Sequence, residues 1–263
     1  MGSLKMPFRT TSQWAKKCTF VENKYQMTTT RKPKYCALGD SITYGFIPRN
    51  YPGHPGQLES YAALAAKMLG MELENHGISD STIANLPENT PMCKRYVEMS
   101  DDADLVTVTG GTNDVRLGVK LGAMEDRGTD TYYGAWHTLL QGLKEKYNPA
   151  RTGKETKIVV LTPIKLLNAA KSHLPNTDEN NAQVLYQWDE WIQAIKEVAA
   201  YYSLPVVDMH NLSGINPHEG RTIKGTHPEY QGYYSPLISD GTHPTKEGAQ
   251  LMAGTLVEFL KQL

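Results

Sequence analysis

The sequence predicts an α/β fold in which a parallel sheet is covered by helices on both faces. From Tyr35 onward, short apolar runs alternate with longer segments of helical period, a pattern typical of parallel sheets. The run "KIVVL" is almost continuously apolar, as expected for a strand that is buried on both faces. With 263 residues, 40% of them hydrophobic, the chain is long enough to bury the core of one large domain.

Five segments have the character of strands. The first, "YCALGD", ends at Gly39 and Asp40, and the second, "MELENHG", has the weakest pattern. The runs "ADLVTVTGG" and "TKIVVLTP" are the strongest, and Pro163 ends the latter because proline cannot continue a central strand. The segment "LPVVDMH" is the last predicted strand.

Four segments between and after these runs have helical character. The first, "ESYAALAAKMLG", is rich in Ala and Leu and closes on Gly70, a usual helix stop. The others are "TYYGAWHTLLQGLKEKY", "NAQVLYQWDEWIQAIKEVAAYY" and the C-terminal "TKEGAQLMAGTLVEFLKQL". The third has an apolar stripe typical of an amphipathic helix, formed by Val184, Leu185, Trp188, Trp191, Ile192 and Ile195. The longest irregular segment, about 208–243, is expected to be a functional loop.

The charge distribution predicts two parts. Residues 1–34 carry a balance of +7, whereas the remainder carries −8. We therefore expect residues 1–33 to form a basic N-terminal arm or lead-in, and residues 34–263 to form the folded domain. The arm could pack on the acidic body, join an oligomer or link to a partner, but a basic solvated lead-in is an equally good interpretation.

Composition argues against several classes of protein. The net charge of −1 gives no case for nucleic acid as the main partner. No apolar run is long enough for a membrane span, and no signal peptide is seen, so a cytoplasmic location is the default expectation. Three cysteines without CxxC spacing predict neither a disulfide framework nor a cysteine zinc site.

The residues that follow the predicted strands carry the functional signal, because ligand sites in open α/β sheets lie at the carboxyl ends of strands. Ser41, Gly77 and Asn113 follow the first three strands, and Asp240 and His243 precede the last helix. Each has an ordinary structural explanation: a helix cap, a glycine turn or a turn that bonds its own backbone. Together they contain every part that a serine ester hydrolase needs.

In that interpretation Ser41 is the nucleophile, His243 accepts its proton, and Asp240 orients the imidazole. The backbone N–H groups of Ser41 and Gly77 and the side-chain amide of Asn113 form the oxyanion hole. A glycine lets the backbone approach the substrate closely, and an asparagine amide donates at any pH.

Four ordered blocks make the sequence similar to the SGNH (GDSL-type) hydrolase family over about residues 35–263. They are "GDS" with Ser41, "NHGISDSTI" with Gly77, "GTND" with Asn113 and "DGTH" with Asp240 and His243. The resemblance implies a three-layer α/β/α sandwich with five parallel strands, similar to flavodoxin. It also implies ester hydrolysis through an acyl-serine, without metal or cofactor. One departure is Asp80-Ser81, where many members have small residues, and we expect Asp80 to point away from the oxyanion hole.

The substrate is predicted to be a small-molecule or polysaccharide ester. Segments expected at the rim, such as "FIPRNYPGHPGQ" and "HEGRTIKGTHPEYQGYYSP", are polar and aromatic, which suits O-acetyl groups of carbohydrate better than long acyl chains. The alternatives are a lysophospholipase or thioesterase, and tyrosines that only pack the loop. The residues considered as substrate contacts are Asp40, Asp114, Arg116, His227 and Tyr234.

Three other classes are weaker. Asp208, His210, His218, His227 and His243 could gather around a metal, but their spacing fits no compact motif. A binding module without activity would be expected to have lost Ser41, Asp240 or His243. A cysteine hydrolase has little support, because Cys36 lies inside the first strand.

The tetrapeptide Gly-Thr-His-Pro occurs twice, with His227 and with His243. Asp240 stands three residues before His243, whereas Lys224 stands three residues before His227. An acid stabilises an imidazolium and a cation disfavours it. The sequence therefore predicts His243 as the base and His227 as a loop residue.

Overall fold

A computed structural model describes residues 31–48, 56–166, 178–215, 221–222, 233–234 and 236–263, without the side chains of residues 178–187, 221–222 and 233–234. Residues 33–263 form one compact unit. The predicted basic arm lies almost entirely outside the described residues, so its role stays a prediction. Within the described residues, no helix is both long and apolar enough to cross a bilayer.

A five-stranded parallel sheet forms the centre of this unit, with strand order β2-β1-β3-β4-β5. The strands are β1 (Lys34–Gly39), β2 (Glu72–Gly77), β3 (Leu105–Thr109), β4 (Lys157–Leu161) and β5 (Val206–Val207). This confirms the predicted α/β class and the flavodoxin-like order that the resemblance implied. The last strand has two residues and is shorter than "LPVVDMH" suggested.

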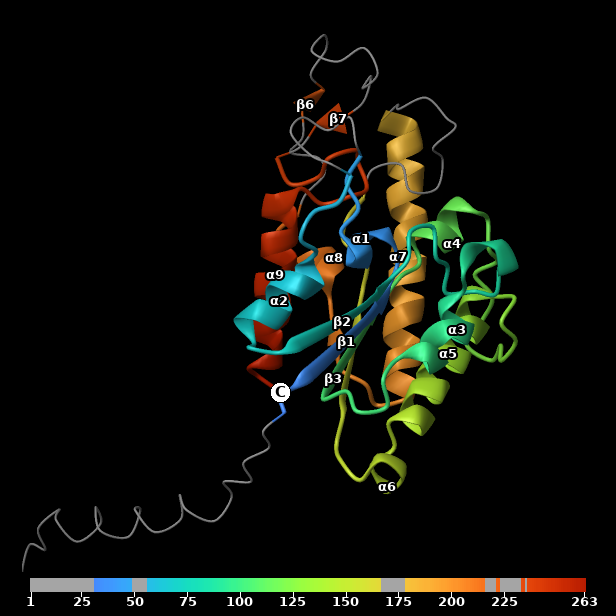
Figure 1. Ribbon diagram of the computed structural model, residues 1–263. Coiled ribbons are helices and arrows are strands. Elements are labelled where there is room, and N and C mark those ends of the chain that lie inside the picture. Colours follow the sequence, from blue (N-terminus) through green and yellow to red (C-terminus); the bar gives the residue numbers. More distant parts are fainter. Residues whose placement is uncertain (1–30, 49–55, 167–177, 216–220, 223–232, 235) are drawn as a thin grey trace, which may run out of the picture. The chain divides into compact units, whose positions relative to one another are not determined.

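Helices cover both faces of the sheet (Figure 1). Helices α2 (Tyr61–Met68) and α9 (Lys246–Leu260) pack together on one face. On the other lie α3 (Met92–Arg95), α5 (Tyr132–Lys146) and α7 (Asp178–Tyr201). Shorter elements complete the fold: α1 (Ser41–Tyr44), α4 (Thr112–Arg116), α6 (Pro149–Thr152), α8 (Met209–Leu212), the 3₁₀ helices η1 (Pro87–Asn89) and η2 (Tyr96–Glu98), and the hairpin of β6 (Arg221–Thr222) and β7 (Tyr233–Tyr234).

Burial explains the sequence patterns of these elements. All five residues of β3 are buried, whereas edge strand β2 is half-exposed along its length, which accounts for the weak pattern of "MELENHG". The predicted stripe of α7 is buried where the structure describes it, at Trp188, Trp191, Ile192 and Ile195. Helices α2, α5 and α9 begin at the side-chain caps Ser60, Thr131 and Thr245.

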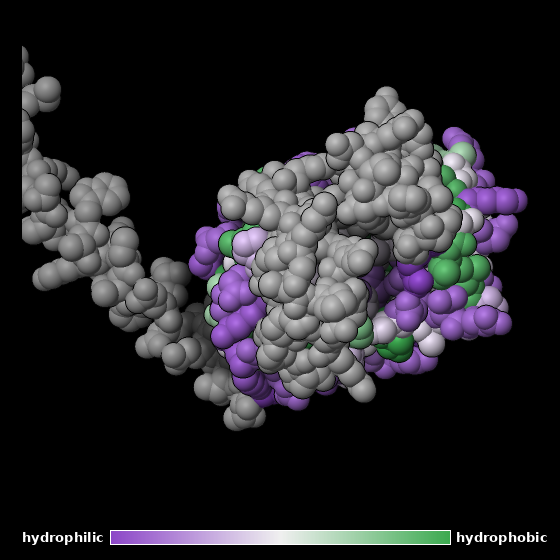
Figure 2. All heavy atoms as spheres, turned by 90° about the horizontal axis from the view of Figure 1, so that it is seen from above, coloured by the Kyte–Doolittle hydropathy of each residue, from purple (hydrophilic) through white to green (hydrophobic). Residues whose placement is uncertain are grey.

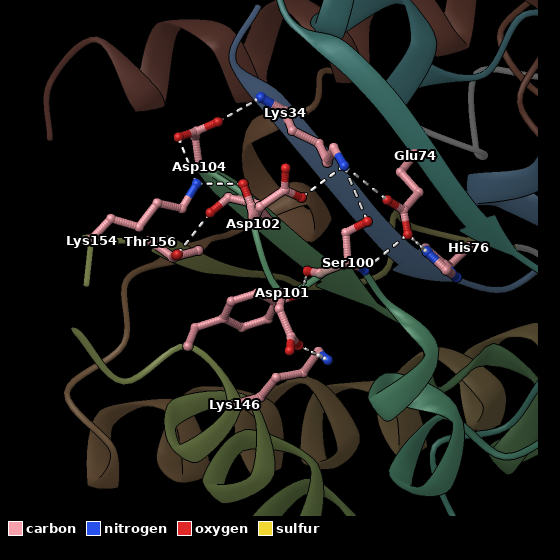
Figure 3. Close-up of polar contacts among 12 residues, drawn as sticks. Lys34, Glu74, His76, Ser100, Asp101, Asp102, Asp104, Lys146, Lys154 and Thr156 are labelled. Carbon is pink, nitrogen blue, oxygen red and sulfur yellow. Dashed lines mark hydrogen bonds and ion pairs between the residues drawn. The ribbon is translucent and has the colours of Figure 1, made fainter. Parts of the chain in front are cut away.

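A network of charged side chains links the amino ends of β1 and β3 to the edge strand β2 (Figure 3). At the start of β1, Lys34 Nζ lies 2.7 Å from Asp102 Oδ1. The main-chain N–H of Lys34 donates to Asp104 Oδ2 at 2.7 Å. Glu74 on β2 accepts from the main-chain N–H of Ser100. Burial alone would raise the pKa of Glu74, but hydrogen bonds from Ser100 and His76 hold it at about 2. The network fixes the amino ends of these strands, and the candidate site lies at their carboxyl ends.

Candidate active site

The nucleophile candidate lies in a sharp turn between β1 and α1. Asp40 caps α1 by accepting from the main-chain N–H of Ile42 at 3.0 Å, and Ser41 is the first residue of the helix. A Cβ on Gly39 would lie 1.9 Å from Thr43 Oγ1. The turn can therefore be this tight only because residue 39 is glycine.

Ser41, His243 and Asp240 form a continuous hydrogen-bonded chain, although Ser41 and His243 are 202 positions apart. Ser41 Oγ lies 2.9 Å from His243 Nε2, and His243 Nδ1 lies 2.6 Å from Asp240 Oδ2. The other carboxylate oxygen, Asp240 Oδ1, accepts from the main-chain N–H groups of His243 at 2.7 Å and Thr242 at 2.9 Å. The acid is therefore held by the same turn that carries the imidazole.

The charge state of Asp240 suits this arrangement. Burial alone would raise its pKa, but hydrogen bonds from His243 and Thr242 outweigh that effect and lower it. Asp240 is thus a carboxylate near neutral pH, and His243 Nδ1 carries the proton of their hydrogen bond. Nε2 of the neutral ring is then the acceptor that faces Ser41.

Asn113 lies after β3, on the short helix α4, with only 5% of its surface exposed. Its Nδ2 donates to the main-chain carbonyl of Ser81 at 3.0 Å. Its Oδ1 accepts from Arg116 Nε at 3.2 Å and Nη2 at 3.0 Å. One N–H of the amide has no acceptor among the described residues. Strands β1 and β3, which carry Ser41 and Asn113, are neighbours where the strand order reverses, the usual ligand position in this type of sheet.

Gly77 has a packing role that the sequence interpretation missed. Its N–H donates to Asn75 Oδ1 at 2.8 Å, so it is not free for an oxyanion. A Cβ at this position would lie 2.2 Å from the main-chain nitrogen of Tyr44, so the glycine is needed for β2 to approach α1. Three residues later, the N–H of Asp80 has no acceptor in the described part of the chain, and its φ of 63° is in the left-handed region.

Two of the expected substrate contacts are interior groups, which corrects the sequence interpretation. Asp40 is 2% exposed and caps α1, and burial raises its pKa to about 6. Asp114 is 0% exposed and accepts from the main-chain N–H groups of Ile83 and Ala84 at 2.9 Å and 2.8 Å. Burial raises the pKa of Asp114 to about 7. Asp40 therefore holds the start of α1, and Asp114 holds the segment of Ile83 and Ala84.

The other expected substrate contacts are Arg116, His227 and Tyr234. Arg116 lies at the site, with its side chain 35% exposed, and pairs with Asp80 at 2.5 Å. Asp80 was expected to point away from the oxyanion hole; its side chain is 67% exposed and its charge is matched by Arg116. His227 and the side chain of Tyr234 lie outside the described residues.

The described residues contain no cluster of three or more His, Cys, Asp or Glu side chains suited to a metal ion. Of the residues considered for that role, Asp208 instead pairs with Lys196 at 2.6 Å. His218 and His227 lie outside the described residues.

Two residues that support the turn were not found from the sequence. The buried Arg95 donates to the main-chain carbonyls of Gly39 and His76, each at 2.6 Å, and so links the ends of β1 and β2. Burial lowers its pKa to about 10. Phe46 packs against the His243 ring, with centroids 4.6 Å apart. Neither belongs to a motif, and only the folded chain brings them to the site.

The sequence matches the model of the GDSL-like lipase/acylhydrolase family over residues 37–251. The chain belongs to this family. Membership of the GDSL-like family places it among serine ester hydrolases in general. No curated protein gives a significant match.

Solved structures agree with the fold of the GDSL-like family. One crystal structure is 28% identical, covers 88% of this chain and 97% of its own, and has a TM-score of 0.68. A protein from Lactobacillus plantarum is 25% identical, with the same coverages and a TM-score of 0.65. A protein described as a possible lipase from Chitinophaga pinensis is 21% identical, covers 87% and 98% of the two chains, and has a TM-score of 0.63. At that identity the last match supports the fold alone.

Proposed function

We propose that this protein is a serine esterase that hydrolyses short-chain esters through an acyl-Ser41 intermediate, with O-acetylated carbohydrate as its substrate class. The observation that carries the proposal is the chain of hydrogen bonds from Ser41 through His243 to Asp240. Such a chain lets a hydroxyl lose its proton as it attacks a carbonyl carbon.

The reaction has two halves. Ser41 Oγ attacks the ester carbonyl while His243 Nε2 takes its proton, and Asp240 stabilises the imidazolium. The tetrahedral intermediate then collapses, the alcohol leaves with the proton from His243, and an acyl-serine remains. A water molecule, deprotonated by the same imidazole, attacks the acyl group and releases the carboxylic acid and free Ser41.

The negative oxygen of each tetrahedral intermediate needs donors that are already in place. We assign this role to the main-chain N–H of Ser41 and to Nδ2 of Asn113. Gly77 was expected to be the third donor, but its N–H is bonded to Asn75. In the same loop, the N–H of Asp80 has no acceptor among the described residues, and it is therefore the better candidate for a second main-chain donor.

The composition of the segments expected at the rim supports a short acyl group and a polar carrier, because "FIPRNYPGHPGQ" and "HEGRTIKGTHPEYQGYYSP" are polar and aromatic. Figure 2 shows that the described part of the surface seen from above is mainly hydrophilic, with separate apolar areas. A lysophospholipase or thioesterase that takes long acyl chains would be expected to have apolar rim segments instead.

The test is a panel of p-nitrophenyl esters of increasing chain length, together with acetylated xylan and acetylated monosaccharides. We expect the C2 ester and the acetylated sugars to be hydrolysed best, and Ser41→Ala to remove the activity. Preference for C8 or longer chains would replace the carbohydrate assignment with the lysophospholipase or thioesterase alternative. Activity that survives in Ser41→Ala would contradict the mechanism itself.

A further inference from the structure

The side-chain amide of Asn113 is held in a single orientation by its neighbours. Arg116 has only hydrogen-bond donors and the main-chain carbonyl of Ser81 has only acceptors. The group that faces Arg116 must therefore be Oδ1, at 3.2 Å and 3.0 Å from its two nitrogens, and the group that faces Ser81 must be Nδ2, at 3.0 Å. A rotation of the amide by half a turn would lose all three hydrogen bonds.

This orientation matters for the proposed reaction. An asparagine amide has nearly the same shape in its two orientations. In one of them it offers an N–H to the oxyanion, and in the other it would place a carbonyl oxygen beside a negative charge. The contacts of Arg116 and Ser81 select the first.

Arg116 is itself braced by Asp80. Its Nη2, which donates to Asn113 Oδ1, also lies 2.5 Å from Asp80 Oδ1. Asp80 has a φ of 63°, which a residue with a Cβ adopts only at a cost. An acid in a left-handed conformation near an oxyanion site would oppose catalysis if it were unpaired, and the guanidinium removes that opposition.

We propose that Arg116, braced by Asp80, is a positioning residue that keeps the Asn113 amide turned to donate to the oxyanion. The inference rests on the proposed serine esterase function. It differs from the sequence interpretation, in which Arg116 was considered a substrate contact. A positioning role predicts a loss in kcat with little change in KM, because the oxyanion forms only after the substrate has bound.

The test is a double-mutant cycle of Arg116→Met and Asn113→Ala, measured by hydrolysis of p-nitrophenyl acetate. Methionine keeps much of the apolar stem of arginine and removes its donors. We expect Arg116→Met to lower kcat about 10- to 100-fold with KM within about 3-fold, because the loss of one oxyanion donor costs about 100- to 1,000-fold. In the Asn113→Ala background, Arg116→Met should lower kcat less than about 2-fold further, because the amide on which it acts is gone.

The exposed Arg151 on α6 gives the matched control. Arg151→Met removes another paired arginine, since Arg151 lies 3.3 Å from Asp101, and should leave kcat and KM unchanged. Circular dichroism and thermal unfolding of each variant show whether it is folded. If Arg116→Met does not fold, Asp80→Asn carries the test: it keeps an oxygen facing Arg116 but removes the charge, and should lower kcat about 2- to 10-fold.

Two results would overturn the inference. One is wild-type kcat in folded Arg116→Met. The other is an equal loss from Arg116→Met with and without Asn113, which would mean that the guanidinium acts on the substrate or on the oxyanion directly. Ser41→Ala separates these results from a failure of the proposed function. Full activity in Ser41→Ala would contradict both the mechanism and this inference. An inactive Ser41→Ala together with wild-type activity in Arg116→Met would contradict the inference alone.

Discussion

The ring of Phe46 lies against the imidazole of His243, with centroids 4.6 Å apart and planes tilted by 60°. The contact limits the rotation of the ring that links Ser41 to Asp240. Phe46 follows directly after the turn that carries Ser41, so the same local segment holds both the nucleophile and one face of the proposed base.

Phe46→Ala is therefore expected to lower kcat while KM changes little. An aromatic pair of this kind contributes about 0.5–1.5 kcal/mol, which corresponds to roughly a 2- to 12-fold loss in rate. Phe46→Leu should retain most of the activity, because it still fills the space beside the imidazole. Hydrolysis of p-nitrophenyl acetate measures both variants, and an unchanged kcat in folded Phe46→Ala would show that the contact does not position His243.

Stability should depend on pH through Asp40. Burial raises its folded pKa from an ordinary 3.8 to about 6, so the folded state favours the protonated acid. The contribution of Asp40 to the free energy of unfolding therefore decreases as pH rises from about 4 to about 6. Above about pH 6 the contribution decreases no further.

Asp40→Asn removes this titration and keeps the helix cap, because asparagine accepts the same hydrogen bond from Ile42. The variant should gain stability relative to wild type as pH rises, by up to about 2–3 kcal/mol at pH 8. Urea unfolding at pH 4.5 and pH 8, followed by tryptophan fluorescence, measures the difference. If the free energies of unfolding of wild type and Asp40→Asn differed by the same amount at both pH values, the assignment of a raised pKa to Asp40 would be contradicted.

Gly77→Ala is expected to destabilise the fold and to lower kcat. The new Cβ would meet the main chain of Thr43 and Tyr44 at 2.6 Å and 2.2 Å, so α1, which begins with Ser41, must shift. The cost should be about 1–3 kcal/mol, as for other overpacked sites.

Gly254 on α9 provides the matched substitution. A Cβ there has open space around it, so Gly254→Ala should stabilise the helix by about 0.5–1 kcal/mol. Thermal unfolding compares the two variants with wild type. Equal melting temperatures for wild type and Gly77→Ala would show that β2 and α1 are less closely packed than described.

The sequence was sufficient for the architecture and for the order of the site blocks. Apolar runs predicted β1, β3 and β4 because those strands are buried on both faces, and the carboxyl ends of β1 and β3 carry Ser41 and Asn113 as expected. The catalytic roles of these residues stay predictions, although the structure brings Ser41, His243 and Asp240 into hydrogen-bonding contact.

Other features depend on three-dimensional contacts that no local pattern contains. The N–H of Gly77 donates to Asn75 Oδ1, and the sequence does not show that the side chain of Asn75 accepts this hydrogen bond. Asp40 and Asp114 were considered as substrate contacts, but both are interior acceptors for main-chain N–H groups. Arg95 supports the turn through carbonyls of two different strands, and its sequence neighbours give no sign of that.

The central claim is that Ser41 is a nucleophile activated by His243 and assisted by Asn113. A p-nitrophenyl phosphonate ester tests it most directly, because attack by Ser41 Oγ forms a stable Oγ–P bond and releases p-nitrophenolate. Intact-protein and peptide mass spectrometry then locate the adduct. We predict one adduct per chain, on Ser41, with slower labelling in His243→Ala and Asn113→Ala and no adduct in Ser41→Ala. An adduct on another residue, or labelling of Ser41→Ala at the wild-type rate, would contradict the account.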